Sequence, residues 1–101
     1  MSETLSHWIN GQAVAGQSGR MGDVFNPAIG EKIAEVPFAG TDEVAKAVAA
    51  ASAAAPEWAA TPPIRRARMI FKFKELIEAR IDEFARIVTR EHGKVLSDAA
   101  G

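Results

Sequence analysis

The residue pattern changes abruptly near residue 40, and this change restricts the possible folds more than any other property of the sequence. Before it, glycine, proline and asparagine separate short apolar runs, as is typical of strands joined by tight turns. After it, apolar residues recur at helical spacing. We therefore expect an α+β fold, with a small antiparallel β meander in residues 1–40 and three helices in residues 41–101.

The meander is predicted over residues 7–38. An Asn-Gly pair at 10–11 separates two short apolar runs, and this pair favours a hairpin turn because both of its positions tolerate positive φ. Pro27 and Gly30 predict a second turn, since proline fixes φ and glycine adopts the left-handed conformation. Residues after that turn alternate in polarity like a half-buried strand, and Pro37 is expected at a sheet edge.

The helices are predicted from caps and breakers. Thr41 is expected to cap the first helix, and Pro56 to end or bend it. Thr61 is expected to cap the second, with two prolines in the first turn, where no N–H partner is needed. The third is predicted from about Glu78 to His92, with Gly93 as its left-handed stop.

Apolar side chains recur on the second and third helices, which predicts a buried side on each. They are Met69, Ile70, Phe73, Leu76 and Ile77, then Ile81, Phe84, Ala85 and Val88. Trp8 and Trp58 are expected to be core or interface anchors. Ser97 as N-cap and Asp98 in a first turn predict a further helix, which we expect to continue in a longer protein.

Composition limits the function classes. A length of 101 residues allows a single domain, and 48% hydrophobic with 25% charged residues is ordinary for a globular protein. A net charge of −1 gives no general attraction to nucleic acid, and no signal peptide or membrane span is visible, so a cytoplasmic location is expected. The absence of cysteine excludes a thiol nucleophile and thiolate metal ligands within this chain.

One dense basic cluster has two interpretations. It consists of Arg65, Arg66, Arg68, Lys72 and Lys74, with no acidic residue before Glu75. It is either a phosphate-binding face or a solvated helix face whose long side chains cover apolar surface. We favour the solvated face, because the whole chain is nearly neutral and no aromatic residues form a stacking platform with the cluster.

The remaining polar residues do not combine into a recognisable site. His7 and His92 lack a metal-ligand spacing and are expected at the surface or at an edge. His92, with Glu91 and Lys94, is better explained as a charged last helical turn. The hydroxyl residues Ser52, Thr89 and Ser97 have no paired base, and no glycine motif for phosphate binding occurs. No catalytic, cofactor-binding or metal-binding residue is therefore assigned.

The order of several segments resembles the amino-terminal portion of the aldehyde dehydrogenase superfamily. The segments are "INGQ", "NPAIGEKIAEVP", "EVAKAVAAASAAAPEWAATP" and "RRARMIFKFKELIEARIDEFARIVTREHGK". Together they span nearly all of the chain. Within the superfamily, "EHGKVLSDA" and the pattern "RMIFKF" are most similar to the CoA-acylating methylmalonate-semialdehyde dehydrogenases.

The resemblance implies that residues 1–101 are the amino-terminal part of a Rossmann-like NAD-binding domain. The whole enzyme would use NAD and CoA to convert methylmalonate or malonate semialdehyde into propionyl-CoA or acetyl-CoA in valine catabolism. It would form dimers or tetramers, without nucleic acid or membrane partners. A family cysteine attacks the aldehyde, so this chain, which has none, is expected to be inactive alone. Lys94 belongs to the family's "HGK" marker and receives no role.

Two alternatives remain open at this stage. The first is another aldehyde dehydrogenase, of the succinate-semialdehyde or betaine-aldehyde type, which differs only in substrate. The second is a self-contained helical module that binds partners or anions through the basic cluster.

Overall fold

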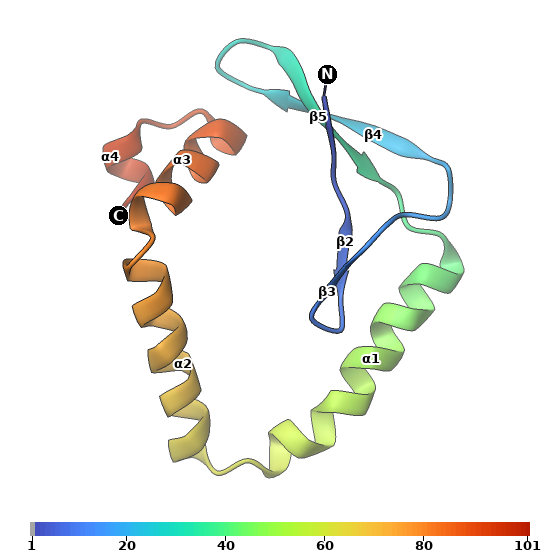
Figure 1. The fold of residues 1–101 in the computed structure, drawn as a ribbon, viewed down its shortest axis with the longest axis vertical. Helices are drawn as coiled ribbons and strands as arrows, with labels where there is room; N and C mark the ends of the chain where they lie inside the picture. Colours follow the sequence, from blue (N-terminus) through green and yellow to red (C-terminus); the bar gives the residue numbers. More distant parts are fainter. Residues whose placement is uncertain (1) are drawn as a thin grey trace. The chain divides into compact units, whose positions relative to one another are not determined.

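The computed structural model describes residues 2–101, and the strands precede the helices along the chain (Figure 1). The strands are β1 Glu3–Thr4, β2 His7–Ile9, β3 Gln12–Val14, β4 Met21–Asn26 and β5 Glu31–Pro37. The helices are α1 Thr41–Ala60, α2 Pro63–Glu78, α3 Ile81–His92 and α4 Leu96–Ala99. The chain divides into a first unit of residues 2–25 and 32–59 and a second unit of residues 26–31 and 60–101. The α+β class with strands before helices is confirmed.

The predicted first hairpin is confirmed. Strands β2 and β3 pair antiparallel, with His7 opposite Val14 and Ile9 opposite Gln12. Asn10 and Gly11 form the turn with φ of 53° and 73°. Both values are positive, as the turn that matches the right-handed twist of the strands requires.

The prediction of one antiparallel meander in residues 1–40 is wrong in two respects. The strands form two separate sheets, β2-β3 and β1-β5-β4, and β1 pairs with β5 in parallel. A period-two pattern identifies strands but not their partners, and β1 is too short to show one. The strand β5 is therefore central rather than an edge. Pro37 is tolerated because it lies beyond Ala34 and Glu35, the residues of β5 that pair with β1.

The first helix runs through Pro56, so of the two predicted effects, an end or a bend, the end is wrong, and the bend stays a prediction. Because the helix begins at Thr41, the N-cap position falls on Gly40 instead of Thr41. The Gly40 N–H donates to the Glu43 Oε2 at 2.7 Å, which places Glu43 at the third helical position of a capping box.

The later helices begin one to three residues from their predicted starts. Pro62, not Thr61, is the N-cap of α2, and α3 begins at Ile81. Gly93 ends α3 as predicted, with φ of 84° and its N–H donating to the Thr89 carbonyl at 2.8 Å. The short α4 starts at Leu96 with Val95 as N-cap, so the predicted Ser97 cap is wrong.

Very little apolar surface is buried within the described residues. Ala34 at 3% exposed, Ala85 at 4% exposed and the buried Pro37 are their only buried apolar residues. The predicted apolar side of α2 is largely exposed, with Phe73 at 60%. None of the helices in residues 2–101 has the length and hydropathy needed to cross a membrane.

Two glycines in the first unit make a matched pair for testing local packing. A Cβ on Gly16 would lie 2.3 Å from the Cβ of Pro37, whereas a Cβ on Gly22 would meet the ring tip of Phe38 at 2.5 Å. The proline is buried and rigid, and Phe38 is 48% exposed and can rotate away. We expect Gly16→Ala to cost about 2–3 kcal/mol in unfolding free energy, and Gly22→Ala well under half of that. Chemical denaturation of both variants tests this, and equal losses would contradict the packing.

Candidate functional site

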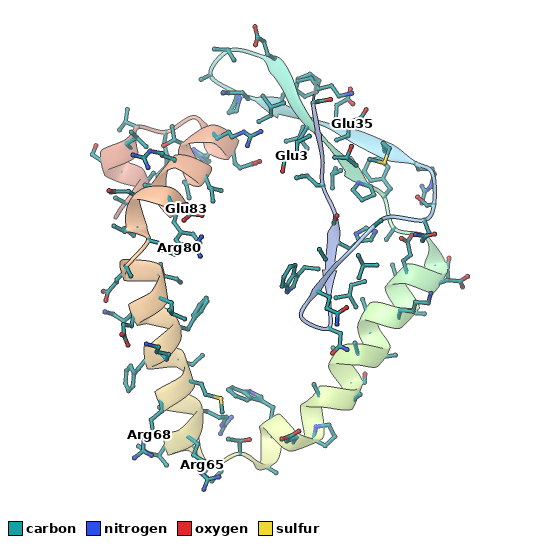
Figure 2. All side chains as sticks on the ribbon, viewed as in Figure 1. Glu3, Glu35, Arg65, Arg68, Arg80 and Glu83 are labelled. Atoms are coloured by element: carbon teal, nitrogen blue, oxygen red, sulfur yellow. The ribbon has the colours of Figure 1, made fainter. Side chains whose placement is uncertain are left out.

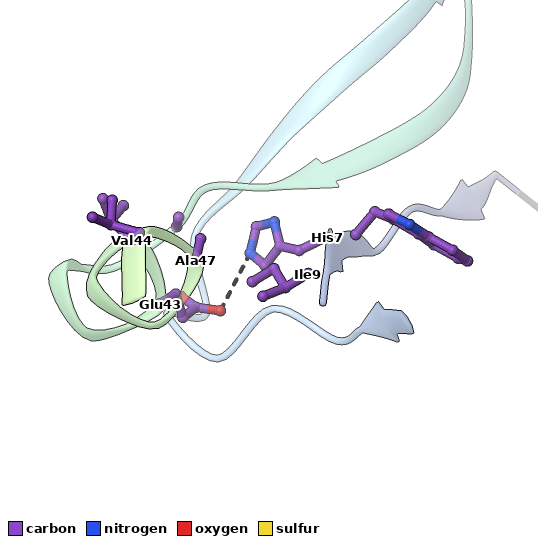
Figure 3. A pocket seen from close by; sticks show the side chains of 8 residues that line it. His7, Ile9, Glu43, Val44 and Ala47 are labelled. Atoms are coloured by element: carbon purple, nitrogen blue, oxygen red, sulfur yellow. Dashed lines mark ion pairs between the residues drawn. The ribbon is translucent and has the colours of Figure 1, made fainter. Parts of the chain in front are cut away.

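The first unit contains a pocket of about 290 Å³ between the β2–β3 hairpin and the first turns of α1 (Figure 3). Apolar groups form most of its wall, and a histidine and a glutamate are its only ionisable residues. It is lined by His7, Trp8, Ile9, Ala39, Glu43, Val44, Ala47 and Val48. In this pocket the side chains of His7 and Glu43 lie within ion-pair distance of each other.

The Glu43 carboxylate is the centre of this arrangement. Its Oε1 accepts the Gln17 backbone N–H at 2.8 Å, and its Oε2 accepts the Gly40 backbone N–H at 2.7 Å. The His7 Nε2 lies 3.2 Å from Oε1, along the dashed line in Figure 3. Glu43 is only 7% exposed. The His7 Nε2 has no hydrogen-bond partner among residues 2–101, and it forms an ion pair with Glu43 when the imidazole is protonated.

Local sequence explains how these groups meet. Glu43 occupies the third position of α1, where a glutamate side chain reaches back to the N-cap N–H. His7 and Ile9 are two residues apart on β2 and therefore face the same side, toward α1. Small residues such as Ala47 allow the hairpin to approach the helix closely. Trp8 points to the other side and is 75% exposed.

The chemistry open to this pair is limited. Hydrogen bonds from the Gly40 and Gln17 N–H groups, followed by the interaction with His7, hold the pKa of Glu43 below the ordinary 4.5. The carboxylate therefore stays ionised near neutral pH, and both its oxygens already accept backbone donors. A general base works best when its pKa lies near the working pH, and a carboxyl whose pKa is lowered does not offer this. We conclude that Glu43 is a structural tie between the hairpin, the 15–20 loop and α1.

Sequence reasoning missed this tie. His7 was expected at the surface or an edge, but its side chain is 18% exposed and paired with Glu43. Glu43 lies in the first turn of the helix predicted from Thr41, and the sequence assigned it no role of its own. Its position three residues after Gly40 was the available signal for the capping interaction, whereas the distant His7 gave none.

The basic cluster on α2 is partly neutralised. Lys72 pairs with Glu75 at 3.1 Å, and Lys74 pairs with Glu78. Arg65 and Arg68 project from the first two turns (Figure 2). The first-turn N–H groups of Arg65 and Arg66 donate to the Pro62 carbonyl, so they do not form a phosphate cradle. The geometry favours the solvated face over the phosphate-binding face.

The other candidates stay apart from one another. His92 is the last residue of α3, and Thr89 lies one turn earlier, with its Oγ1 buried and without a hydrogen-bond partner among the described residues. Within residues 2–101, no three histidine, aspartate or glutamate side chains gather as metal ligands would. Trp8 and Trp58, at 75% and 44% exposed, are not core anchors, and their role at an interface remains a prediction.

Comparison with known proteins identifies the family. The family model described as "Aldehyde dehydrogenase family" matches residues 13–101. The chain is 48% identical over 98 residues to the malonate-semialdehyde dehydrogenase of Pseudomonas aeruginosa, covering 97% of this chain and 20% of that protein. It is 47% identical over 100 residues to malonate-semialdehyde dehydrogenase 3 of Geobacillus kaustophilus, covering 99% of this chain and 21% of that protein.

A solved structure agrees with the sequence relatives. The crystal structure of a protein from Sinorhizobium meliloti 1021, assigned as a methylmalonate-semialdehyde dehydrogenase and complexed with NAD, superposes with a TM-score of 0.94 at 48% identity. The match covers 100% of this chain and 21% of that one. The chain thus spans about a fifth of the length of the curated relatives it matches, and it corresponds to the amino-terminal part of their fold. This chain is a member of the aldehyde dehydrogenase family.

Proposed function

We propose that the protein to which this chain belongs is an NAD-dependent, CoA-acylating methylmalonate-semialdehyde dehydrogenase that also accepts malonate semialdehyde. The reaction converts the semialdehyde, NAD⁺ and CoA into an acyl-CoA, NADH and carbon dioxide. Methylmalonate semialdehyde yields propionyl-CoA, and malonate semialdehyde yields acetyl-CoA. The supporting observation is the 46–48% identity to malonate- and methylmalonate-semialdehyde dehydrogenases over nearly the whole chain.

The residues of this chain would support the reaction rather than perform it. The sequence has no cysteine, so the nucleophile for the aldehyde would come from elsewhere in the protein. The pocket beside Glu43 does not fit NAD, because its ionised carboxylate would face the negative pyrophosphate and a dinucleotide exceeds a space of about 290 Å³. When bound in the whole protein, NAD supplies the hydride acceptor.

Residues 1–101 would form the amino-terminal part of the NAD-binding domain, with residues 41–101 supplying its helices. The assembly we propose is a homodimer or homotetramer. A cytoplasmic location stays a prediction from the sequence.

The low burial argues against a self-contained helical module. A module of this size would need a sealed core, yet Ala34, Pro37 and Ala85 are the only apolar residues buried among those described. Many large apolar side chains are instead exposed, which is expected of a chain whose partners lie in the rest of a larger domain.

The activity is tested on the protein of native length. We expect NADH formation with methylmalonate semialdehyde that depends on CoA, and propionyl-CoA as the product detected by mass spectrometry. The 101-residue chain by itself is the matched control and should give no NADH. Preferred oxidation of succinate semialdehyde or betaine aldehyde would replace our substrate assignment. Turnover by the isolated chain would contradict our inference that the nucleophile for the aldehyde lies elsewhere in the protein.

A further inference from the structure

The second unit contains a separate pocket of about 380 Å³, between the turn that joins β4 to β5 and the last turns of α3. The turn is rigidly built, because the Asn26 Oδ1 accepts the Ala28 N–H at 3.0 Å and the Asn26 carbonyl accepts the Gly30 N–H at 2.8 Å. It lies against the end of α3, since a Cβ on Gly93 would be 3.2 Å from the Cγ of Pro27.

The polar groups of this pocket are donors. It is lined by Asn26, Ala28, Arg86, Thr89, Arg90 and Leu96. Thr89 and Arg90 follow Arg86 by three and four residues, so both lie on the face of α3 that carries Arg86. The Asn26 Oδ1 is already occupied, which leaves its amide NH₂ as a donor. No carboxylate lines the pocket.

Two of these donors are unsatisfied in the described part of the chain. The Thr89 Oγ1 is buried and has no hydrogen-bond partner there, although an unpaired buried hydroxyl is costly. Arg86 makes no ion pair with any described residue, and the nearby Glu83 is engaged by Arg80 through contacts of 2.7 and 2.8 Å. A guanidinium and a hydroxyl therefore remain available to an acceptor in the same pocket.

We propose that this pocket is an anion-binding site that holds the phosphate group of a small molecule. Arg86 would supply the charge and a forked pair of donors, and Thr89 and Asn26 would donate to further oxygens. A phosphate offers more acceptor oxygens than a carboxylate and so matches donors that come from both the turn and the helix. The proposal is independent of the dehydrogenase activity, because it concerns residues of this chain alone.

Calorimetric titration of the native-length protein tests the site. The probes are inorganic phosphate and adenosine monophosphate, and adenosine, which lacks the phosphate group, is the uncharged control. We expect Arg86→Gln to weaken binding about tenfold or more, and Thr89→Val about three- to tenfold. Arg68→Gln removes an exposed arginine of α2 and is the matched control, expected to change the Kd less than about twofold. Tighter binding of adenosine monophosphate than of phosphate would assign the site to organic phosphates, and equal binding would assign it to the free ion.

Two results would overturn the proposal. One is the absence of binding of both phosphate probes at millimolar concentration. The other is an equal loss in Arg68→Gln and Arg86→Gln, which would indicate general attraction to positive charge. Circular dichroism shows whether Arg86→Gln folds. If it does not, the binding of phosphate to Thr89→Val tests the site instead, because removing an unpaired buried hydroxyl should leave the Tm unchanged or higher. Unweakened binding in Thr89→Val would then reject the site.

Discussion

Replacing Glu43 by alanine is expected to free the β2–β3 hairpin and the 15–20 loop from α1. The substitution removes the acceptor of the Gln17 and Gly40 N–H groups and the charge opposite His7. We expect hydrogen exchange at the Gln17 and Gly40 amides to accelerate by about tenfold to a hundredfold, because both donors lose their partner while the elements around them stay formed. Site-resolved exchange by NMR measures the effect.

Glu75→Ala is the control for this substitution. Glu75 makes an exposed pair with Lys72 on α2, and its loss should leave exchange at Gln17 and Gly40 unchanged. Unchanged exchange at both amides in Glu43→Ala would contradict the tie between these segments.

The same carboxylate also predicts a pH dependence. The pKa of Glu43 is lower in the folded protein than the ordinary 4.5, so its stabilisation is fully present above that value. As the pH falls through the lower folded pKa, the carboxyl becomes protonated and the stabilisation is lost. We expect Glu43→Gln to have a flatter stability profile than the wild type across this acidic window. Parallel profiles for the two proteins, measured by denaturant titration, would contradict the assignment.

Local signals in the sequence predicted those parts of the fold that depend on one or a few neighbouring residues. The Asn10-Gly11 hairpin and the Gly93 helix stop both require positive φ, which few residue types adopt. Caps, breakers and apolar spacing together located α2 and α3 to within three residues at their starts. The errors at Thr41, Thr61 and Ser97 all concern caps, where several neighbouring residues are chemically able to serve.

Pairings between distant residues were not predictable in this way. The parallel pairing of Glu3 with Ala34 and the contact of His7 with Glu43 each join segments about thirty residues apart. The pattern of a single strand or helix does not name its partner. The candidate site was missed for this reason, since its geometry depends on the hairpin meeting α1. The pocket beside α3 was missed likewise, because the turn at 26–31 meets Thr89 only in three dimensions.

The second helix carries apolar side chains on two sides, whereas an ordinary surface helix carries them on one. Met69, Phe73 and Leu76 follow helical spacing on one side, and Ile64 and Phe71 lie seven residues apart on another. Phe71 and Phe73 are about 200° apart around the helix axis. They are 67% and 60% exposed in this chain. A helix with two apolar sides is stable in water only when both are covered.

We therefore expect Phe71→Ala and Phe73→Ala to lower the stability of the native-length protein far more than that of the isolated chain. In the native-length protein, where the remaining chain would cover both sides of α2, each substitution should lower the free energy of unfolding by about 3–5 kcal/mol. In the isolated 101-residue chain, the same substitutions should change it by less than about 0.5 kcal/mol, because both rings are already exposed. Lys72→Ala, between them, is the control and should have little effect in either context. Small losses from both phenylalanines in the native-length protein would mean that α2 is a free surface helix, and the self-contained module would again become the better explanation.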